Sequence, residues 1–227
     1  MKYGTPIRRG GLLSLAAALL CTCICMLSRG NAQALDAKTL AQRVNRHYNS
    51  LRSLKVGFTE NYQGMGMNRT ESGTLYLLKP GRMKWDYSSP AGKLFLVDGK
   101  YAWFYSRGAP QVQRISAKQL DDLRSPLRFL LGHSELEKEF DHLTAANAPN
   151  GLFTLTGQPK GQENRIARVM LTVTASGSIT GIEVEENDGA VTRFTFTGEI
   201  PNAPIAAGTF HFTPPPGIPV VNTMPPV

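Results

Sequence analysis

The sequence predicts an α+β fold that is mainly β, a strongly curved antiparallel sheet or barrel with a few helices on one face. Three observations predict it. Runs of alternating apolar and polar residues recur at the spacing of hairpins. Turn signals such as Asp98-Gly99 and Asn187-Asp188-Gly189 separate these runs. The helical patterns are too few to cover both faces of such a sheet.

The first 34 residues have the pattern of a cleavable secretory leader. Their start is basic, residues 12–27 are mostly apolar, and Ala32-Gln33-Ala34 fits cleavage after Ala34. The alternative, an uncleaved anchor, is disfavoured because the apolar core is short and Arg29 follows it. All three cysteines lie in this leader. We therefore expect one secreted domain over residues 35–227 that has no disulfide and depends on its apolar core.

The helix expected first in this domain covers Leu35 to Leu54. Asp36 suits its N-cap, and a face of apolar residues follows at helical spacing. The pattern then changes to a period of two over Lys55 to Tyr62, which indicates a strand. Another strand is predicted over Thr70 to Lys79. The face of the helix consists of Leu40, Val44, Tyr48, Leu51 and Leu54.

The stretch from Gly73 to Tyr105 holds both tryptophans and predicts an antiparallel meander with one very apolar face. Met83, Trp85 and Tyr87 alternate with charged residues, so they share one side of a strand. Lys93 to Val97 and Tyr101 to Tyr105 are expected to form a hairpin around Asp98-Gly99.

A helical insertion is expected from Ser116 to Leu143, with Ser125 as an N-cap and Pro126 at the first helical position. It is expected to plug one end of a barrel or to cover a concave sheet. The polar segment Gln111 to Ile115 before it is predicted as an edge strand. Further strands are predicted after it, over Leu152 to Thr156, Arg165 to Thr174, Ser178 to Glu185, Val191 to Gly198 and around Phe210 and Phe212.

Composition and motifs argue against several classes of function. Four of the 25 basic residues and none of the 17 acidic residues lie in the leader, so the remainder has a net charge of +4. This charge is ordinary and predicts no nucleic-acid partner. The mature chain has no thiol, no catalytic motif and no histidine pair at metal-ligand spacing, so we expect no enzyme, cofactor or metal. We also expect a monomer.

Several segments, taken in order, resemble the LolA family of periplasmic outer-membrane lipoprotein carriers. The resemblance covers about Leu35 to Val221. The segments are residues 54–60, 73–77, Lys79-Pro80-Gly81-Arg82-Met83-Lys84-Trp85, Asp98-Gly99-Lys100 before Trp103-Phe104-Tyr105, Ser125-Pro126-Leu127, and Phe210 to Pro215.

The resemblance implies an incomplete, unclosed β-barrel whose open side is capped by a helical lid, with acyl chains held in between. The apolar sheet face agrees with it, and the alternative for these residues is an ordinary core. The cavity residues expected on this basis are Phe58, Leu75, Leu77, Met83, Trp85, Tyr87, Leu94, Leu96 and Trp103.

The resemblance also implies a lid and a latch. Leu127, Phe129, Leu130 and Leu131 are the expected lid contacts, or else plain helix packing. The family has a basic residue, commonly arginine, before the proline of the 79–82 loop, where it helps to hold the lid closed. That position is Lys79 here, so the latch is Lys79 or the nearby Arg82.

The function implied is that of a periplasmic chaperone for acylated lipoproteins. It takes its cargo from an inner-membrane ABC lipoprotein release complex and delivers it to an outer-membrane lipoprotein receptor. Two alternatives remain on the same fold, a sensor or regulator that binds a membrane partner and a carrier of free lipid or glycolipid.

Overall fold

The computed structural model of the chain describes residues 1–4, 36–122 and 135–223. The chain divides into two units, Met1–Gln33 and Ala34–Val227, and the fold below is that of the second unit. Within the described residues, none of the helices has the length and apolar character needed to cross a membrane.

Helix α1 (Ala37–Ser50) begins at Asp36 as predicted, because this side chain accepts a hydrogen bond of 2.9 Å from the backbone N–H of Thr39. The apolar face predicted from helical spacing is buried at Leu40, Val44 and Tyr48. The helix is shorter than the sequence pattern suggested, since the chain turns into a strand just after it.

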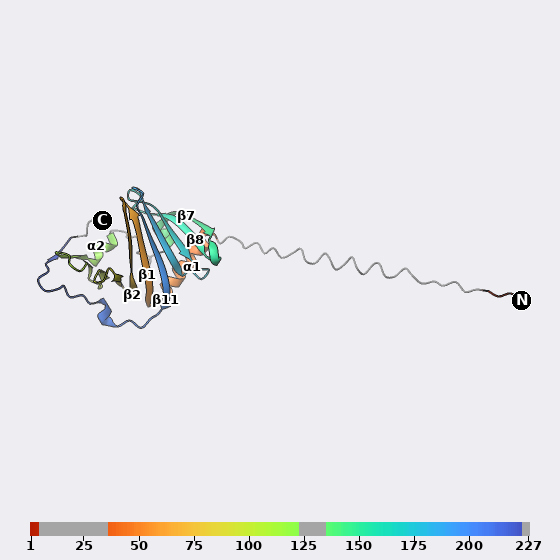
Figure 1. Ribbon diagram of the computed structural model, residues 1–227, viewed down its shortest axis with the longest axis horizontal. Coiled ribbons are helices and arrows are strands. Elements are labelled where there is room, and N and C mark those ends of the chain that lie inside the picture. The colour runs from red at the N-terminus through yellow and green to blue at the C-terminus, as the bar shows by residue number, and fades with distance from the viewer. Residues whose placement is uncertain (5–35, 123–134, 224–227) are drawn as a thin grey trace. The chain divides into compact units, whose positions relative to one another are not determined.

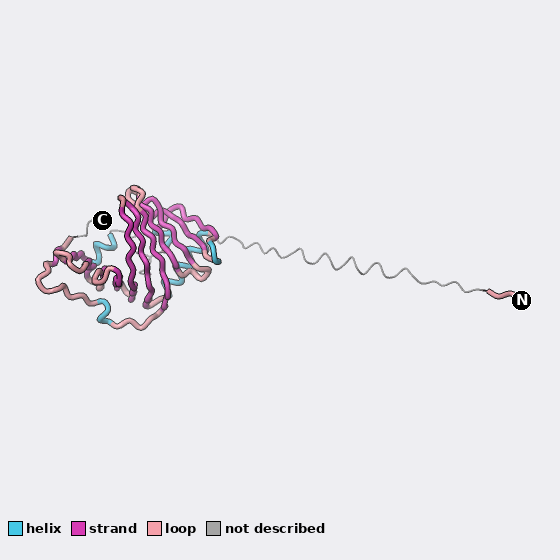
Figure 2. The backbone as a smooth tube through the Cα atoms, in the orientation of Figure 1, coloured by secondary structure: helices cyan, strands magenta, loops and turns pink. Residues whose placement is uncertain are grey.

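A single twelve-stranded sheet accounts for most of the fold (Figures 1 and 2). Its strand order is β12-β6-β5-β4-β3-β2-β1-β11-β10-β9-β8-β7, and all neighbours are antiparallel except β12 and β6. The outer strands β12 and β7 do not pair with each other, so the sheet is unclosed, as expected. The strands are β1 (Ser53–Gly64), β2 (Met67–Leu78), β3 (Arg82–Ser89), β4 (Leu94–Val97), β5 (Tyr101–Tyr105), β6 (Val112–Ser116), β7 (Phe140–Asn147), β8 (Phe153–Pro159), β9 (Ile166–Val173), β10 (Ile179–Glu186), β11 (Val191–Pro201) and β12 (Val220–Val221).

The main core lies on one face of this sheet, which we call the inner face. Residues of β1, β2, β3 and the β8–β11 half meet the apolar side of α1 there. Short helices α2 (Ala117–Asp122) and α3 (Leu136–Glu139) are also described, and α1 contacts α3, β7 and β8. Asn45 of α1 accepts from the backbone N–H of Leu136 and donates to Glu137, which fixes α3 to α1.

A second apolar cluster lies on the opposite, outer face, over β4, β5 and β6. Phe210 is buried there against Leu96, Trp103 and Val112, and Phe212 packs beside it. After β11 the chain reaches this face by an irregular path that includes the 3₁₀ turn η3 (Ala207–Phe210), and β12 then pairs with β6. Another 3₁₀ turn, η2 (Pro149–Gly151), joins β7 to β8.

Two sequence-based predictions of secondary structure were wrong at their ends. Leu54, placed on the helix, belongs to β1 and pairs with Leu77 and Pro201. The helix predicted through Leu143 ends at Glu139, because Phe140 begins β7 and pairs with Pro159. In both cases the residue spacing fits either structure, and strand pairing distant in sequence decides.

The strand predicted around Phe210 and Phe212 does not form. Phe210 ends a 3₁₀ turn and Phe212 follows it in an irregular segment. Their alternation reflects contact of both rings with the outer face, where Phe212 lies 5.7 Å from Trp103 between ring centroids. The edge strand predicted over 111–115 lies one position in from the end of the sheet, since within the described residues β12 pairs beside β6.

Candidate functional site

A cavity with a volume of about 390 Å³ opens on the inner face of β3, β4 and β5. Aromatic side chains form most of its apolar wall, and a polar group of side chains forms one side. The lining residues are Glu60, Met83, Trp85, Tyr87, Lys93, Leu94, Phe95, Phe104, Tyr105, Ser106, Ala109, Gln111, Gln113 and Phe194.

Trp85 is the centre of the aromatic wall. Its ring centroid lies 4.8 Å from that of Phe58 and 5.3 Å from that of Phe194, and its indole N–H points to the sulfur of Met83 at 3.3 Å. Strand register explains this grouping, because Trp85 pairs with Leu75 of β2 and with Phe95 of β4. Directly paired residues project from the same face of a sheet.

Most of the predicted cavity residues lie at or beneath this cavity. Met83, Trp85, Tyr87 and Leu94 line it, and Leu94 also packs against the outer cluster. The predicted residues Phe58, Leu75 and Leu77 are buried in the main core on the inner face, and Phe58 contacts both Trp85 and Tyr87.

Leu96 and Trp103 were predicted to line the cavity, but neither residue lies at it. Both belong to the outer cluster with Phe210. Leu96 pairs with Lys84 and with Trp103, so all three project from the face opposite Trp85. Trp103 also donates its indole N–H to Asp98 at 2.7 Å, which ties it to the turn of its own hairpin.

The three phenylalanines that line the cavity, Phe95, Phe104 and Phe194, are among the lining residues that were not predicted from the sequence. Phe95 and Phe104 are stacked with ring centroids 4.8 Å apart and pair directly across β4 and β5. The segment 94–97 has no polar residue to mark its outward side, so alternation alone does not determine its register. The neighbouring strand is the signal that identifies Phe95 and Phe104. Because Trp85 faces inward, its partner Phe95 faces inward, and so does Phe104 across the next hairpin.

The polar side of the cavity is built on two buried glutamates. Glu71 is 5% exposed and pairs with Arg69, at 3.2 Å, and with Lys93. Glu60 is 9% exposed and accepts a hydrogen bond of 2.9 Å from the hydroxyl of Tyr87. Burial, with the nearby charge of Glu60, raises the pKa of Tyr87, so the phenol stays protonated.

Lys79 contacts the C-terminal end of α1. Its Nζ donates to the backbone carbonyl of Tyr48 at 2.7 Å and to that of Asn49 at 3.3 Å. A lysine here satisfies carbonyls that the helix leaves unpaired and complements the negative end of its dipole. Burial lowers the pKa of Lys79. Arg82 is exposed and lines a small hollow beside Lys79, and neither residue lines the main cavity.

The predicted lid contacts Leu127, Phe129, Leu130 and Leu131 lie outside the described residues.

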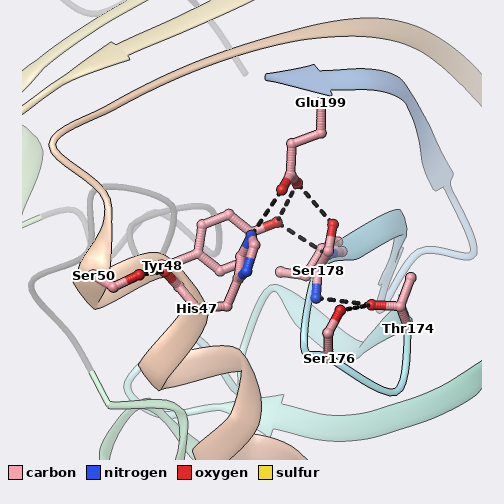
Figure 3. Close-up of polar contacts among 8 residues, drawn as sticks. His47, Tyr48, Ser50, Thr174, Ser176, Ser178 and Glu199 are labelled. Atoms are coloured by element: carbon pink, nitrogen blue, oxygen red, sulfur yellow. Dashed lines mark hydrogen bonds and ion pairs between the residues drawn. The ribbon is translucent and has the colours of Figure 1, made fainter. Parts of the chain in front are cut away.

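A polar network joins α1 to the sheet through the same part of the helix that Lys79 contacts (Figure 3). Glu199 of β11 lies 2.7 Å from the Nε2 of His47 and accepts from Ser178 at 2.8 Å. The hydroxyl of Tyr48 accepts from the backbone N–H of Ile179 at 3.0 Å and points to Glu199 at 3.5 Å. Burial raises the pKa of Tyr48, with the charge of Glu199 adding to it. These contacts attach α1 to β11 and to the start of β10.

The described residues contain no group of three or more side chains placed to hold a metal ion. The arrangement as a whole offers an apolar hollow with a polar side, which suits binding of an apolar or amphipathic ligand.

Comparison with known proteins identifies the protein family that this chain resembles. The family model for the outer membrane lipoprotein carrier protein LolA matches residues 49–213. An outer-membrane lipoprotein carrier protein of Nitrosospira multiformis is 32% identical over 156 residues, which cover 68% of this chain and 73% of that protein. One from Chromobacterium violaceum is 27% identical over 196 residues, covering 86% and 93%.

Among solved structures, an uncharacterized conserved protein from Thermus thermophilus has the same fold, with a TM-score of 0.53 and 14% identity. The match covers 82% of this chain and 99% of that one, and it bears on the fold alone. The family model, by contrast, spans the sheet from β1 to β11 together with the segment around Phe210 and Phe212. This chain belongs to the LolA family.

Proposed function

We propose that this protein carries acylated lipoproteins through the periplasm, with their acyl chains in the cavity on the inner face. Membership of the LolA family supports the type of cargo, because its relatives are named outer-membrane lipoprotein carrier proteins. The observation that carries the proposal is the aromatic cavity of about 390 Å³, which falls within the range of about 300–1,000 Å³ typical of ligand sites.

Energetics explain why such a carrier needs a sheltered site. Each methylene group of an acyl chain moved from apolar surroundings into water costs about 0.8 kcal/mol. A lipid-modified protein therefore does not leave a membrane unaided. A cavity walled by Met83, Trp85, Phe95, Phe104 and Phe194 replaces the membrane interior for part of the chain.

Delivery requires no covalent step. Cargo moves to whichever site binds it more tightly, so a carrier acts between a donor and an acceptor of graded affinity. We propose an inner-membrane ABC release complex as the donor and an outer-membrane lipoprotein receptor as the acceptor, with the carrier acting as a monomer and without enzymatic activity. Residues 1–34 act as the leader for export and are removed after Ala34 in this proposal.

We further propose that Lys79, rather than Arg82, is the latch residue and that it acts by holding the end of α1 in place. Support comes from its two hydrogen bonds to the end of α1, whereas Arg82 has no side-chain hydrogen bond among the described residues. Holding α1 fixes one wall of the core that the cavity adjoins.

Two linked experiments test the carrier function. Depleting the protein in its host should leave lipoproteins in the inner membrane. Protein purified from the periplasm should bring acylated peptides with it, identified by mass spectrometry. Normal lipoprotein sorting after depletion, in a host with no other member of the LolA family, contradicts the proposal. Recovery of free lipids alone, or of a single regulatory protein without acylated peptides, favours one of the alternatives instead.

A further inference from the structure

Glu60 places a carboxyl group in the wall of a cavity whose apolar side is largely aromatic. It stands on β1, and its direct partners across the two neighbouring strands are Phe194 and Glu71. It is 9% exposed, and the surface that remains contributes to the lining of the cavity. An acidic group at this position is not needed to shape an apolar pocket, and burying it is costly unless it is hydrogen-bonded.

The hydrogen bonding of Glu60 is incomplete within the described part of the chain. An ionised carboxylate has two oxygens with about four acceptor positions. Oε2 of Glu60 accepts from the Tyr87 hydroxyl, and no described residue donates to Oε1. Glu71 provides the contrast, since its Oε1 contacts Arg69 and its Oε2 contacts Lys93. Glu60 is thus a buried acceptor with capacity left for a ligand.

Lys93 supplies the complementary donor on the same wall. Its ammonium group has three N–H donors and contacts a single carboxylate oxygen of Glu71. It lies 4.3 Å from the centroid of the Tyr87 ring, whose hydroxyl bonds to Glu60. Glu60 and Lys93 therefore both contact one tyrosine, Glu60 by accepting from its hydroxyl and Lys93 as a cation over its ring, and both line the cavity.

The chemistry of acyl linkages decides which ligand this pair suits. An ester has hydrogen-bond acceptors only, so it can accept from Lys93 but leaves the carboxylate of Glu60 without a donor. A fatty acid anion brings a negative charge next to a buried carboxylate, which is unfavourable. An amide offers both a carbonyl for Lys93 and an N–H for Glu60, and hydrogen bonds to charged partners are the stronger kind.

We propose that Glu60 and Lys93 form a polar subsite for the amide linkage of an acyl chain whose tail lies on the wall around Trp85. This inference rests on the proposed carriage of acyl chains and adds the orientation of the chain and a preference among linkages.

The test compares three ligands with the same dodecanoyl tail, N-methyldodecanamide, methyl dodecanoate and the dodecanoate anion. Their binding to the purified mature protein at neutral pH is measured by displacement of a fluorescent fatty probe. We expect the amide to bind about tenfold more tightly than the ester, the size of one charge-assisted hydrogen bond, and the anion to bind most weakly. In Glu60→Met the ester should bind at least as well as before, and the preference for the amide should disappear.

Glu185→Gln is the matched control. Glu185 lies on β10 in an ion pair with Arg168, away from the cavity lining, so this variant should keep the wild-type order of the three ligands. If Glu60→Met does not fold, Glu60→Gln, which keeps the size and the acceptor but loses the charge, should reduce the preference to about threefold or less.

The outcomes separate this inference from the function on which it rests. Equal binding of amide and ester by the wild-type protein, or an unchanged preference in Glu60→Met, overturns the subsite while leaving acyl carriage supported. Failure of all three ligands to bind overturns both.

Discussion

Trp85 determines much of the cavity at the scale of single residues. It is buried, it touches Phe58 and Phe194, and it forms part of the wall that an acyl chain would contact. A residue that serves both core and site makes ligand binding sensitive to any change of its polarity.

Trp85→Glu should therefore unfold the protein or abolish acyl binding, because it places an unpaired charge in an apolar site. We expect a loss of stability of at least about 3–5 kcal/mol, the range for removing a large aromatic core residue. Trp85→Phe keeps an apolar ring and is the control. Denaturant unfolding and fluorescent fatty-probe binding measure both effects, and a Glu variant with wild-type stability and binding would place residue 85 outside the site.

Lys79→Met should lower the free energy of unfolding by about 1–2 kcal/mol, since two backbone carbonyls of α1 lose a charged donor. Amide hydrogen exchange should rise in the last turn of α1. Lys79→Arg should retain most of the stability, and Arg82→Met should have little effect. If Arg82→Met loosens α1 and Lys79→Met does not, the latch has been assigned to the wrong residue.

Residue identities in the site were partly predictable from sequence. Met83, Trp85 and Tyr87 alternate with Lys84 and Asp86, so polarity fixes which way they point. The run 94–97 contains no polar residue to mark its outward side. Leu96 was therefore predicted on the inner face, where the structure has Phe95. Alternation places Glu60 on the same side of its strand as Val56 and Phe58, but nothing in the sequence marks this glutamate as part of a binding site.

At the scale of elements, several specific contacts hold α1 against the sheet. The turn between β9 and β10 packs directly against it, and the guanidinium of Arg43 donates to the carbonyl of Ala175 at 2.8 Å. Gly177 in that turn has φ of +96°, and a Cβ there would lie 2.4 Å from the backbone oxygen of Arg43. Only glycine allows the turn and the helix to come this close.

Gly177→Ala should destabilise the protein by about 2–4 kcal/mol, from backbone strain together with displacement of α1. Gly189→Ala is a matched control, because Gly189 has φ of +87° but nothing within 4 Å of the added methyl group. It should show the strain alone, about 1 kcal/mol. Denaturant unfolding measures both losses, and equal losses in the two variants would mean that α1 is not held against this turn.

Glu199 should make the attachment of α1 sensitive to acid. Burial acts to raise the pKa of Glu199, but hydrogen bonds from His47 and Ser178 outweigh it and hold the pKa below its usual 4.5. A depressed pKa in the folded state stabilises the protein above the unfolded-state value, and this contribution is lost as pH falls through the folded-state value.

Glu199→Gln should therefore be less stable than the wild type at neutral pH, and the difference should shrink as the pH drops below about 4.5. Urea unfolding across this range measures it, with Glu185→Gln as the control for a more exposed carboxylate on the same sheet. A difference that is constant with pH would show that Glu199 contributes through shape rather than charge.

At the scale of the whole molecule, each face of the sheet carries its own apolar cluster. The inner face carries the main core and the cavity, and the outer face is covered by the segment around Phe210 and Phe212. Sequence patterns predicted the mainly β fold, the first helix and most hairpins, because these depend on local period and turn chemistry. They did not predict β7 or the path of the segment after β11, which depend on partners far away in the chain.

The central claim is that acyl chains occupy the inner cavity, and photo-crosslinking tests it most directly. A lipopeptide whose acyl chain carries a diazirine is bound to the purified protein, irradiated, and mapped by mass spectrometry. The account predicts crosslinks on the cavity wall, at residues such as Trp85, Phe104 and Phe194, that disappear when unlabelled lipopeptide competes. Crosslinks confined to the outer cluster around Trp103 and Phe212, or none that are competed, would contradict it.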